Sequence, residues 1–546
     1  MKPFSRLLDA LSYQPQRNLK IRLLADYFSR THDPDRGYGL AALTGVLDFA
    51  HAKPALLRGL AAERVDPELF AWSYDYVGDL AETISLIWPK AGDEATPHSL
   101  GEIVAALQHT SKSSLPGFIA AQLDRMSRTE RFAFMKLITG GLRVGVSARL
   151  AKTALAEWSG KPLLEIEEVW HGLTPPFLDL FAWLEGRAGP PKAKGKTRFR
   201  PVMLAHPLDE ADLQLLDPKD FMAEWKWDGI RVQLVCENGE RRLFSRTGDD
   251  ISNAFPDVLE PAPDNAVIDG ELLIIKNGKV ESFAELQQRL NRKEVTSRMK
   301  QERPAGILAY DLLLDGPEDL RGRSFKERRA LLEGFIVRAS SPRLNISPLV
   351  EFKSWEELAA KRAQGTEDGA PVEGLMLKRR DSRYEAGRIT GLWYKWKRDP
   401  HLIDAVMMYA QRGHGKRSSF YSDYTFGVWR GQGGDRELVP VGKAYFGFTD
   451  EELKEIDRFV RNNTIGRFGP VREVVHEDGR GLVLEVAFEG LQRSTRHKSG
   501  VAMRFPRINR LRWDKPPREA DTIEALEKLL QAQRPMAEAS TSEGSN

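Results

Sequence analysis

The chain has 546 residues, of which 41% are apolar and 29% are charged, a composition typical of globular proteins. This length is too great for one hydrophobic core and predicts about two to four domains. Lysine and arginine (81) nearly balance aspartate and glutamate (78), so the net charge of +3 neither indicates nor excludes binding to nucleic acid. No apolar run reaches about 18 residues, and the first residues lack the apolar core of a signal peptide. We therefore expect a cytoplasmic protein that does not bind membranes.

The sequence contains one cysteine, Cys236. A single cysteine excludes an internal disulfide framework and any zinc site built from several cysteines. Cys236 ends the alternating apolar run that begins at Val232, which predicts a buried strand residue rather than a reactive thiol.

Residues 1–185 are predicted to form an all-α domain. Apolar residues recur at spacings of three and four in Ile21–Phe28, Leu56–Ala62 and Phe132–Ile138. Residues 186–199 are rich in Gly, Pro and Lys, which predicts an exposed linker. A basic surface loop would have the same composition.

The remainder of the chain is predicted to contain two further domains. In residues 200–398, β-branched runs such as Ala266–Ile275 alternate with turns and helical segments, which predicts an α+β domain. Strand patterns such as Leu482–Phe488 dominate residues 399–520 and predict a small β-barrel. Residues 521–546 are expected to form a terminal helix, up to about residue 533, and a disordered tail.

The segment from Glu224 to Arg231 reads Glu-Trp-Lys-Trp-Asp-Gly-Ile-Arg and has Lys226 near its centre. A lysine attacks a phosphoryl group only as the neutral amine, so a site must lower the usual lysine pKa of about 10.4. Nearby cations, a bound metal and burial all do this. Gly229 permits close backbone approach, and the guanidinium of Arg231 suits anions. A surface turn held by salt bridges explains this short pattern equally well.

Four more charged segments follow apolar strand patterns in a defined order. They are Ser245–Gly248, Asp269–Glu271, Glu373–Lys378 and Trp393–Lys397. Any one of them alone is more typical of a strand that ends at a solvated turn. Together with Lys226, they predict one charged cleft.

This order resembles that of the covalent nucleotidyltransferases, and specifically the ATP-dependent DNA ligases. Lys226-Trp-Asp-Gly229 is similar to the nucleophile motif, and the four segments above, with Tyr310-Asp311, are similar to the motifs that follow it. Arg512-Trp-Asp-Lys515 is similar to the terminal motif. The resemblance covers residues 200–520 and implies an adenylation domain followed by an OB-fold barrel.

The N-terminal region extends the resemblance. Residues 141–147, Gly-Leu-Arg-Val-Gly-Val-Ser, are similar to a segment in the helical DNA-binding domain of larger ligases, including the bacterial B-type enzymes. Gly145 would allow close approach to a DNA phosphate, next to a helix N-terminus that favours anions. Arg143 is a second candidate DNA contact. A plain connection between two helices is the alternative.

The resemblance implies three phosphoryl transfers on nicked duplex DNA. Lys226 attacks the α-phosphate of ATP to give lysyl-AMP, AMP moves to the 5′-phosphate at the nick, and the 3′-hydroxyl displaces AMP. Such transfers depend on positioning and charge neutralisation. We expect a monomer that associates with the bacterial nucleoid through DNA and acts in replication, repair or recombination.

The resemblance also implies roles for residues around the nucleotide. Glu271 and Glu373 would hold Mg²⁺ or Mn²⁺, since hard carboxylate oxygens suit such cations. Glu224 would lie near the adenine. Tyr310 would stack on the base where relatives usually have phenylalanine, although a core aromatic on a buried strand is a serious alternative.

Basic residues would contact the phosphates and the ribose. Arg231 and Arg246 are assigned to ribose or phosphate, and Arg246 also to DNA. Lys395 and Lys397 would bind the α-phosphate, with Lys378 as a further candidate. Relatives often carry an arginine six residues before the first of these lysines, but Ile389 stands there, and the neighbouring Arg388 is the candidate instead.

In the predicted barrel, the terminal motif residues Arg512, Asp514 and Lys515 would orient pyrophosphate and later contact DNA. Asp399 lies where a hinge between the two domains is expected. A basic run is either a DNA contact or a solvated face; it consists of Arg493, Arg496, His497 and Lys498.

Three other classes fit the sequence less well. NAD-dependent ligases usually need four cysteines for a zinc module and a nicotinamide-binding segment. A capping enzyme shares Lys-x-Asp-Gly but would not need the helical region, and the ending from Arg504 to Lys515 fits ligases better. A non-catalytic DNA scaffold would not need intact Lys226 and Lys395. The sequence does not specify the pathway, the strand type, the metal preference or protein partners.

Overall fold

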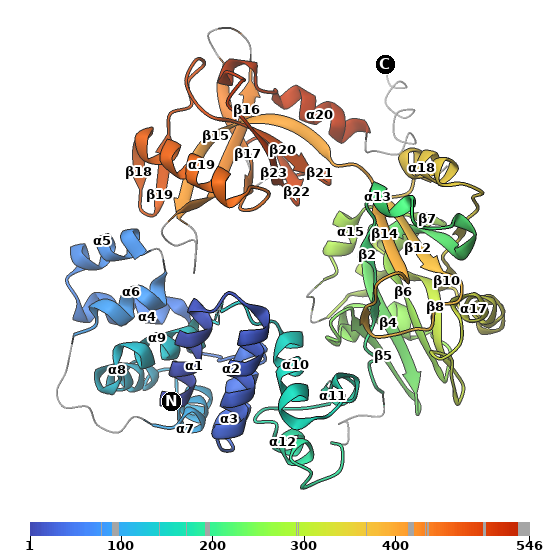
Figure 1. Ribbon diagram of the computed structural model, residues 1–546, viewed down its shortest axis with the longest axis horizontal. Coiled ribbons are helices and arrows are strands. Elements are labelled where there is room, and N and C mark those ends of the chain that lie inside the picture. The colour runs from blue at the N-terminus through green and yellow to red at the C-terminus, as the bar shows by residue number, and fades with distance from the viewer. Residues whose placement is uncertain are drawn as a thin grey trace. The chain divides into compact units, whose positions relative to one another are not determined.

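The computed structural model of the chain is shown in Figure 1. It describes residues 1–546 except 78, 90–97, 141, 143, 171, 192–196, 291, 293, 367–368, 413–419, 432, 434–435, 495–497 and 533–546. The chain divides into two compact units, one of Met1–Ile166, Leu173–Pro191 and Pro400–Leu530, the other of Glu167–Gly172, Lys192–Asp399 and Gln531–Asn546. In the described ranges, no helix is long and apolar enough to cross a membrane.

The N-terminal region is helical, as the sequence predicts. Its helices are α1 (Lys2–Tyr13), α2 (Arg17–Arg30), α3 (Asp35–Leu43), α4 (Pro54–Arg64), α5 (Pro67–Val77), α6 (Leu80–Ile87), α7 (Leu100–His109), α8 (Leu115–Arg125), α9 (Arg128–Thr139), α10 (Ala148–Ser159), α11 (Leu163–Trp170) and α12 (Leu178–Leu184). On α2, Ile21, Leu24 and Phe28 are buried, which is the face expected from spacings of three and four. Ser99 and Ser127 begin α7 and α9 with capping boxes.

The segment 200–398 contains two main β-sheets with helices beside them. One sheet has the order β10-β8-β6-β4-β5 and the other β11-β3-β12-β14-β2. The first sheet uses β4 (Ile230–Glu237), β5 (Glu240–Ser245), β6 (Ala266–Lys276), β8 (Ala305–Asp315) and β10 (Leu344–Ile346), with β7 (Lys279–Val280) and β9 (Glu318–Asp319) at its side. The second uses β2 (His206–Pro207), β3 (Phe221–Trp227), β11 (Leu349–Val350), β12 (Val372–Arg379) and β14 (Trp393–Lys397), while β1 (Met203–Leu204) pairs with β13 (Gly387–Arg388).

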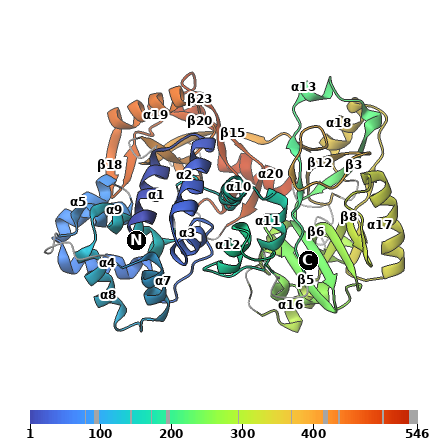
Figure 2. The same ribbon diagram turned by 60° about the horizontal axis from the view of Figure 1, so that its bottom comes forward.

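Helices cover these sheets and complete their cores. They are α13 (Glu210–Leu213), α14 (Pro256–Leu259), α15 (Phe283–Gln287), α16 (Ser297–Glu302), α17 (Phe325–Ala339) and α18 (Trp355–Gln364), with 3-10 turns at Pro218–Asp220 and Ser252–Ala254. The long helix α17 packs against β8 and β10 (Figures 1 and 2). Its buried residues Leu332 and Phe335 join the core of the larger sheet. The α+β texture predicted for this region is confirmed.

The turn between β3 and β4 links the two sheets and carries Gly229. A Cβ at Gly229 would lie 2.6 Å from the carbonyl oxygen of Leu272 and 2.8 Å from Cγ of Glu271. Only glycine therefore lets this turn approach β6 so closely. The turn that follows Lys226 is thereby held against the strand that carries Glu271.

The C-terminal β domain is the part of the first unit from Pro400 to Leu530. Its sheet has the order β17-β16-β15-β19-β18, with β20 pairing both β15 and β23, and β21 pairs β22. The elements are β15 (His401–Arg412), β16 (Tyr421–Arg430), β17 (Glu437–Ala444), α19 (Asp450–Asn462), β18 (Thr464–Phe468), β19 (Val471–Val474), β20 (Val483–Phe488), β21 (Gly490–Arg493), β22 (Val501–Arg504), β23 (Arg507–Arg512), a 3-10 turn at Pro517–Glu519 and α20 (Ile523–Ala532). The strand-dominated texture and the terminal helix agree with the sequence prediction.

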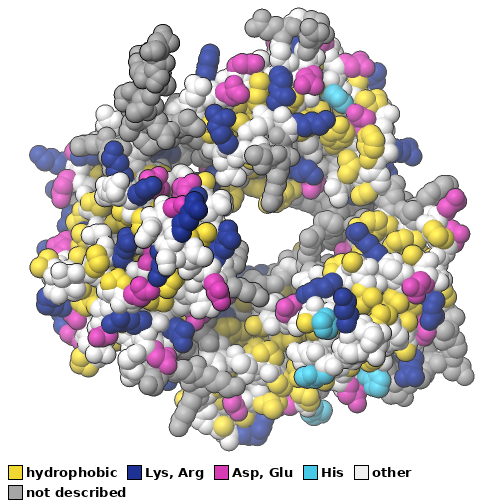
Figure 3. Space-filling view, turned by 180° about the vertical axis from the view of Figure 1, so that it is seen from behind, with side chains coloured by type: hydrophobic (Ala, Val, Ile, Leu, Met, Phe, Trp, Pro, Cys, Tyr) yellow, Lys and Arg dark blue, Asp and Glu magenta, His cyan; other side chains and the backbone are white. Residues whose placement is uncertain are grey.

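The surface carries both signs of charge. On the face drawn in Figure 3, Lys and Arg side chains are interspersed with Asp and Glu, as the small net charge of +3 predicts. Total charge therefore does not mark a DNA-binding face, and the individual sites must be built from their residues.

Candidate active site

Lys226 lies on β3, where β12 separates it from β14. Gly374 of β12 is paired with Lys226 on one side and with Lys397 on the other. Met376 is likewise paired with Glu224 and with Lys395. Directly opposed residues of antiparallel strands project to the same face of a sheet. The sheet therefore brings together lysines that lie far apart in the sequence.

A β-bulge directs Glu373 toward Lys226. The pairing of β12 with β3 shifts between Val372 and Gly374, so Glu373 is the extra residue, and bulges of this kind re-aim a side chain. The ammonium of Lys226 donates a hydrogen bond to Oε2 of Glu373. Gly374 has a φ of +142°, and a Cβ there would lie 2.8 Å from Cα of Lys397. Glycine is thus needed both for the backbone angle and for the close approach of β14.

Glu224 is buried between two cations. Its Oε1 accepts a hydrogen bond from Arg329 of α17 at 2.8 Å, and its Oε2 lies 2.7 Å from Nζ of Lys378. Burial raises the pKa of the Glu224 carboxyl, and the charges of Lys378 and Arg329 oppose that rise. Burial likewise lowers the pKa of the Lys378 ammonium. Both groups therefore belong to one buried ion network within the sheet that carries Lys226.

Arg231 is held by neighbours on three sides. It forms two hydrogen bonds with Asp269, at 3.0 and 2.6 Å, and donates to the carbonyl oxygen of Met203 at 2.6 Å and to the hydroxyl of Tyr384 at 3.2 Å. Tyr384 in turn donates to Asp269 at 2.5 Å. Arg231, which the resemblance assigned to ribose or phosphate, is thus part of a buried network with Asp269 and Tyr384.

The protonation of Glu271 is strongly perturbed. It lies on β6 directly opposite Arg231 of β4. Burial raises the pKa of Glu271 to about 8; the charges of Lys226 and Arg231 oppose this rise, whereas the negative charge of Glu373 adds to it. A carboxyl whose pKa is raised by a neighbouring carboxylate favours its charged form again when a cation binds beside it.

Four other cations surround Lys395. Burial lowers the pKa of the Lys395 ammonium, and nearby positive charges lower it further. These charges belong to Lys397, Arg388, Lys226 and Arg246. The cluster includes the exposed Arg388 on β13, whose role the sequence left open. A cluster of this sign is suited to a polyphosphate.

The ring of Tyr310 lies against buried cations. Nζ of Lys378 is 4.4 Å from its ring centroid, and the guanidinium carbon of Arg231 is 5.8 Å away. Tyr310 is half-buried on β8, so both interpretations drawn from the sequence remain: a base-stacking surface and a core aromatic.

In the C-terminal β domain, the predicted motif residues Arg512, Asp514 and Lys515 form one ion cluster. Arg512 binds Asp514 at 2.9 Å and Asp404 at 3.0 Å. Lys515 donates to the same carboxylate of Asp404 at 2.8 Å. Of the basic run, Arg493 ends β21 and the carbonyl of Lys498 accepts a hydrogen bond from Arg430; Arg496 and His497 lie outside the described residues.

In the helical region, Gly145 lies in an exposed loop and has a φ of +66°. The ammonium of the buried Lys20 donates to the carbonyl oxygen of Val144 and takes up the space that a Cβ of residue 145 would need. Ser147 follows as the N-cap of α10. Arg143 lies outside the described residues.

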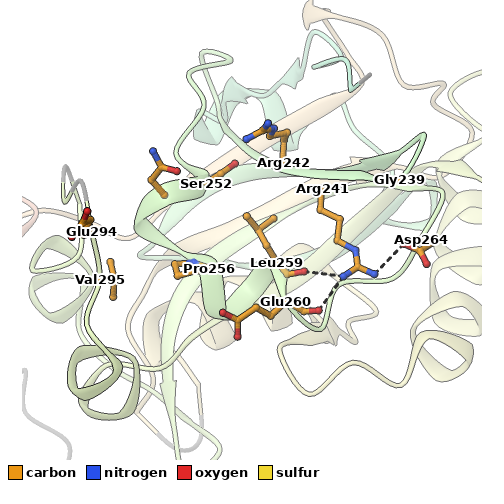
Figure 4. Close-up of a pocket in the computed structure, with 11 residues that line it drawn as sticks. Gly239, Arg241, Arg242, Ser252, Pro256, Leu259, Glu260, Asp264, Glu294 and Val295 are labelled. Carbon is orange, nitrogen blue, oxygen red and sulfur yellow. Dashed lines mark hydrogen bonds and ion pairs between the residues drawn. The ribbon is translucent and has the colours of Figure 1, made fainter. Parts of the chain in front are cut away.

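Two further features lie away from this cleft. Cys236 is buried on β4, and burial raises the pKa of its thiol to about 12, so the predicted inert strand residue is confirmed. An open pocket of about 750 Å³ lies beside β5 and α14 (Figure 4). There Arg241 binds Asp264 and the carbonyl of Glu260.

Comparisons with known proteins agree on one family. The family model "ATP dependent DNA ligase domain" matches residues 202–397, and "ATP dependent DNA ligase C terminal region" matches residues 417–515. A probable DNA ligase of Koribacter versatilis is 32% identical over 98% of this chain and 97% of the relative. The chain belongs to the ATP-dependent DNA ligases. DNA ligase 1 of Korarchaeum cryptofilum is 30% identical over 98% of each protein.

The fold of the ligase also matches solved structures. The structure named Pmar-Lig_PreS3 has a TM-score of 0.58 and covers 93% of this chain at 16% sequence identity, which supports the fold alone. The chain is therefore an enzyme of this family, with a helical N-terminal region followed by two regions that contain β-sheets. Membership implies dependence on ATP and on a divalent metal.

The sequence reasoning missed several residues that bind the predicted site residues of this ligase. Arg328 and Arg329 of α17 bind Asp311 and Glu224, while Tyr384 and Asp404 bind predicted site residues from other elements. One local signal was available: two adjacent arginines follow the capping box of Ser324 in the first turns of α17. Their partners are distant in sequence, so that signal could not name them.

Proposed function

We propose that this ligase seals nicks with a 5′-phosphate and a 3′-hydroxyl through a lysyl-AMP intermediate at Lys226, followed by AMP-DNA. The observation that carries the proposal is the place of Lys226. Its ammonium donates a hydrogen bond to Glu373, and it is one of the four cations whose charges act on Lys395. A nucleophilic amine at the edge of such a cluster faces the position of a bound triphosphate.

In the first transfer, the lone pair of Lys226 Nζ forms a bond to the α-phosphorus as the bond to pyrophosphate breaks. The amine must lose a proton before it attacks, and its ammonium donates a hydrogen bond to Glu373. Drawing Glu373 toward a cation would release the amine. Lys395 and Lys397, with Arg388 and Arg246, would neutralise charge that develops on the phosphates.

The carboxylates fit the divalent metal that the family implies. Glu271 and Glu373 have hard oxygen donors, and the raised pKa of Glu271, with Glu373 as one cause, is relieved by a nearby cation. We assign Mg²⁺ or Mn²⁺ to this pair. When bound, the metal supplies charge neutralisation for the reacting phosphates.

The base is assigned to the surface formed by Tyr310 and the buried network around Glu224. We propose that Tyr310 stacks on adenine. Lys378 and Arg231 then act mainly from beneath, since each is bound to a buried carboxylate. In this proposal, they fix the buried side of the pocket and neutralise its carboxylates.

We assign domains as the sequence suggests: a helical DNA-binding domain at 1–185, a linker at 186–199, an adenylation domain at 200–398, an OB-fold domain at 399–520 and a terminal segment at 521–546. Arg143 and Gly145 would contact the DNA backbone, and Asp399 would lie at the hinge. Arg512, Asp514 and Lys515 would orient pyrophosphate in step one. The enzyme would act as a cytoplasmic monomer on nicked duplex DNA in replication, repair or recombination.

The decisive experiment is incubation with ATP labelled at the α-phosphate. We expect the wild type to retain the label covalently. The control variant Lys219→Ala, which changes an exposed lysine, should also retain it. Lys226→Ala should retain none while still binding nicked DNA. Covalent label on Lys226→Ala would identify another nucleophile. Label from GTP but not from ATP would favour a capping enzyme instead.

A further inference from the structure

A buried carboxylate of the C-terminal β domain contacts both cations of the segment Arg512-Trp-Asp-Lys515. Asp404 lies on β15 and is 9% exposed. Its Oδ2 accepts hydrogen bonds from Nη1 of Arg512 at 3.0 Å and from Nζ of Lys515 at 2.8 Å. One oxygen atom therefore bridges the two positive side chains.

The backbone of Asp404 is itself held firmly in the sheet. Its N–H donates to the carboxylate of Asp521 at 2.7 Å, and its carbonyl accepts from the N–H of Asp521 at 2.8 Å. Asp404 also stands opposite Glu485 in the pairing of β15 with β20. The backbone that carries the bridging carboxylate is thus fixed in the sheet, and Arg512 and Lys515 bind to that carboxylate.

The two cations depend on Asp404 to different degrees. Arg512 also binds Asp514 at 2.9 Å and lies 3.9 Å from Glu485. Among the residues that the structure describes, Asp404 is the only carboxylate within 4 Å of Nζ of Lys515. Loss of the Asp404 charge would leave Arg512 with two acidic partners and release Lys515.

Two neighbouring positive groups repel each other unless an anion lies between them. A pyrophosphate group has adjacent oxyanions and is best met by cations that already stand side by side. A shared carboxylate offsets this repulsion and holds the two cations side by side before the substrate arrives.

We propose that Asp404 is a positioning residue that holds Arg512 and Lys515 as one preformed pair for the pyrophosphate group in the first transfer. The inference rests on the proposed function of this motif. Asp404 acts through the two cations and does not itself touch the nucleotide.

The test compares two steps in full-length variants. Formation of lysyl-AMP is followed in a single turnover over a range of ATP concentrations, and closure of a pre-adenylated nick is followed separately. We expect Asp404→Asn to slow the first step about tenfold or more, the size of effect typical of losing a charged hydrogen bond, and Asp404→Glu to recover part of the rate. Closure should slow less than the first step, because it releases no pyrophosphate.

Asp457→Asn is the matched control. Asp457 is 8% exposed in the same β domain and binds the N–H of Tyr421 at 3.0 Å and Nε of Arg461 at 2.6 Å. We expect this variant to form lysyl-AMP at the wild-type rate, whatever its melting temperature.

The inference is overturned if Asp404→Asn forms lysyl-AMP as fast as the wild type or faster. It is also overturned if lysyl-AMP formation, closure and melting temperature all fall together, as a purely structural role requires. If the wild type forms no lysyl-AMP at all, the proposed function itself is wrong. If instead the wild type and Asp404→Asn both form lysyl-AMP at the normal rate, only the role of Asp404 is refuted.

Discussion

At the scale of single residues, one bulge and two carboxylates define the surroundings of the proposed nucleophile. Glu373 reaches Lys226 only because β12 has an extra residue beside Gly374. Glu271 lies close enough to Glu373 for each negative charge to disfavour the other. Backbone geometry and protonation at this site can therefore be tested one residue at a time.

Gly374→Ala should disrupt the cleft. The new Cβ would meet β14 at 2.8 Å from Cα of Lys397, and φ is +142°, so we expect a loss of about 2 kcal/mol or more in unfolding free energy. Lysyl-AMP formation should fall with it. Gly278→Ala is the control, since its φ is +79° but its Cβ would enter open space; about 1 kcal/mol is expected there. Equal losses in urea unfolding would show that crowding at Gly374 is unimportant.

The protonation of Glu271 should make the stability of the metal-free enzyme depend on pH. Its folded-state pKa is raised from 4.5 to about 8, so between these values the folded chain keeps a proton that the unfolded chain has lost. This contribution is fully present below the lower value and is lost as pH rises through the higher one.

Melting temperatures in EDTA measure this effect. The wild type should lose stability relative to Glu271→Gln as pH rises from about 4.5 to 8, and added Mg²⁺ should reduce the difference because the metal favours the ionised carboxylate. A wild-type curve parallel to that of Glu271→Gln would contradict the assigned burial of this charge.

At the scale of elements, helix α17 connects the two sheets of the catalytic region. Arg328 is fully buried and binds Asp311 of β8 at 2.7 Å, while the next residue, Arg329, binds Glu224 of β3. One helical turn thus neutralises buried acids from both sheets. The helix acts as a structural support for the strand that carries Lys226.

Removing the buried ion pair of α17 should destabilise the protein strongly. Arg328→Ala leaves Asp311 without its guanidinium in a buried site, at an expected cost of about 3–5 kcal/mol. Arg338→Ala, on the same helix, removes an exposed pair with Asp315 and should cost less than about 1 kcal/mol. Urea unfolding of both variants measures the difference. Similar midpoints would mean that the Asp311 site rehydrates easily.

At the scale of the whole molecule, DNA binding and nucleotide transfer are assigned to separate regions. The candidate nucleotide residues from Glu224 to Lys397 belong to one compact unit, whereas the candidate DNA contact at Gly145 belongs to the other. Separate sites predict that the two activities can be separated experimentally.

Deletion of residues 1–185 should weaken binding to nicked DNA but spare lysyl-AMP formation. Each lost phosphate contact should reduce the slope of log affinity against log salt by about 0.9. Binding measured at several salt concentrations, with lysyl-AMP formation as the control for folding, tests this prediction. Unchanged affinity and slope would remove the DNA-binding role from the helical region.

The sequence by itself determined the broad fold and the family, and it named the candidate residues of the site. Periodic apolar residues predicted the N-terminal helices, and the order of the charged segments led to the family, because both signals are local. The partners were decided only by the tertiary structure: Arg231 with Asp269, Glu224 with Lys378 and Arg329, and Asp404 with Arg512 and Lys515. Pairing depends on strand register, a bulge and helix packing between distant segments, and no local pattern encodes these.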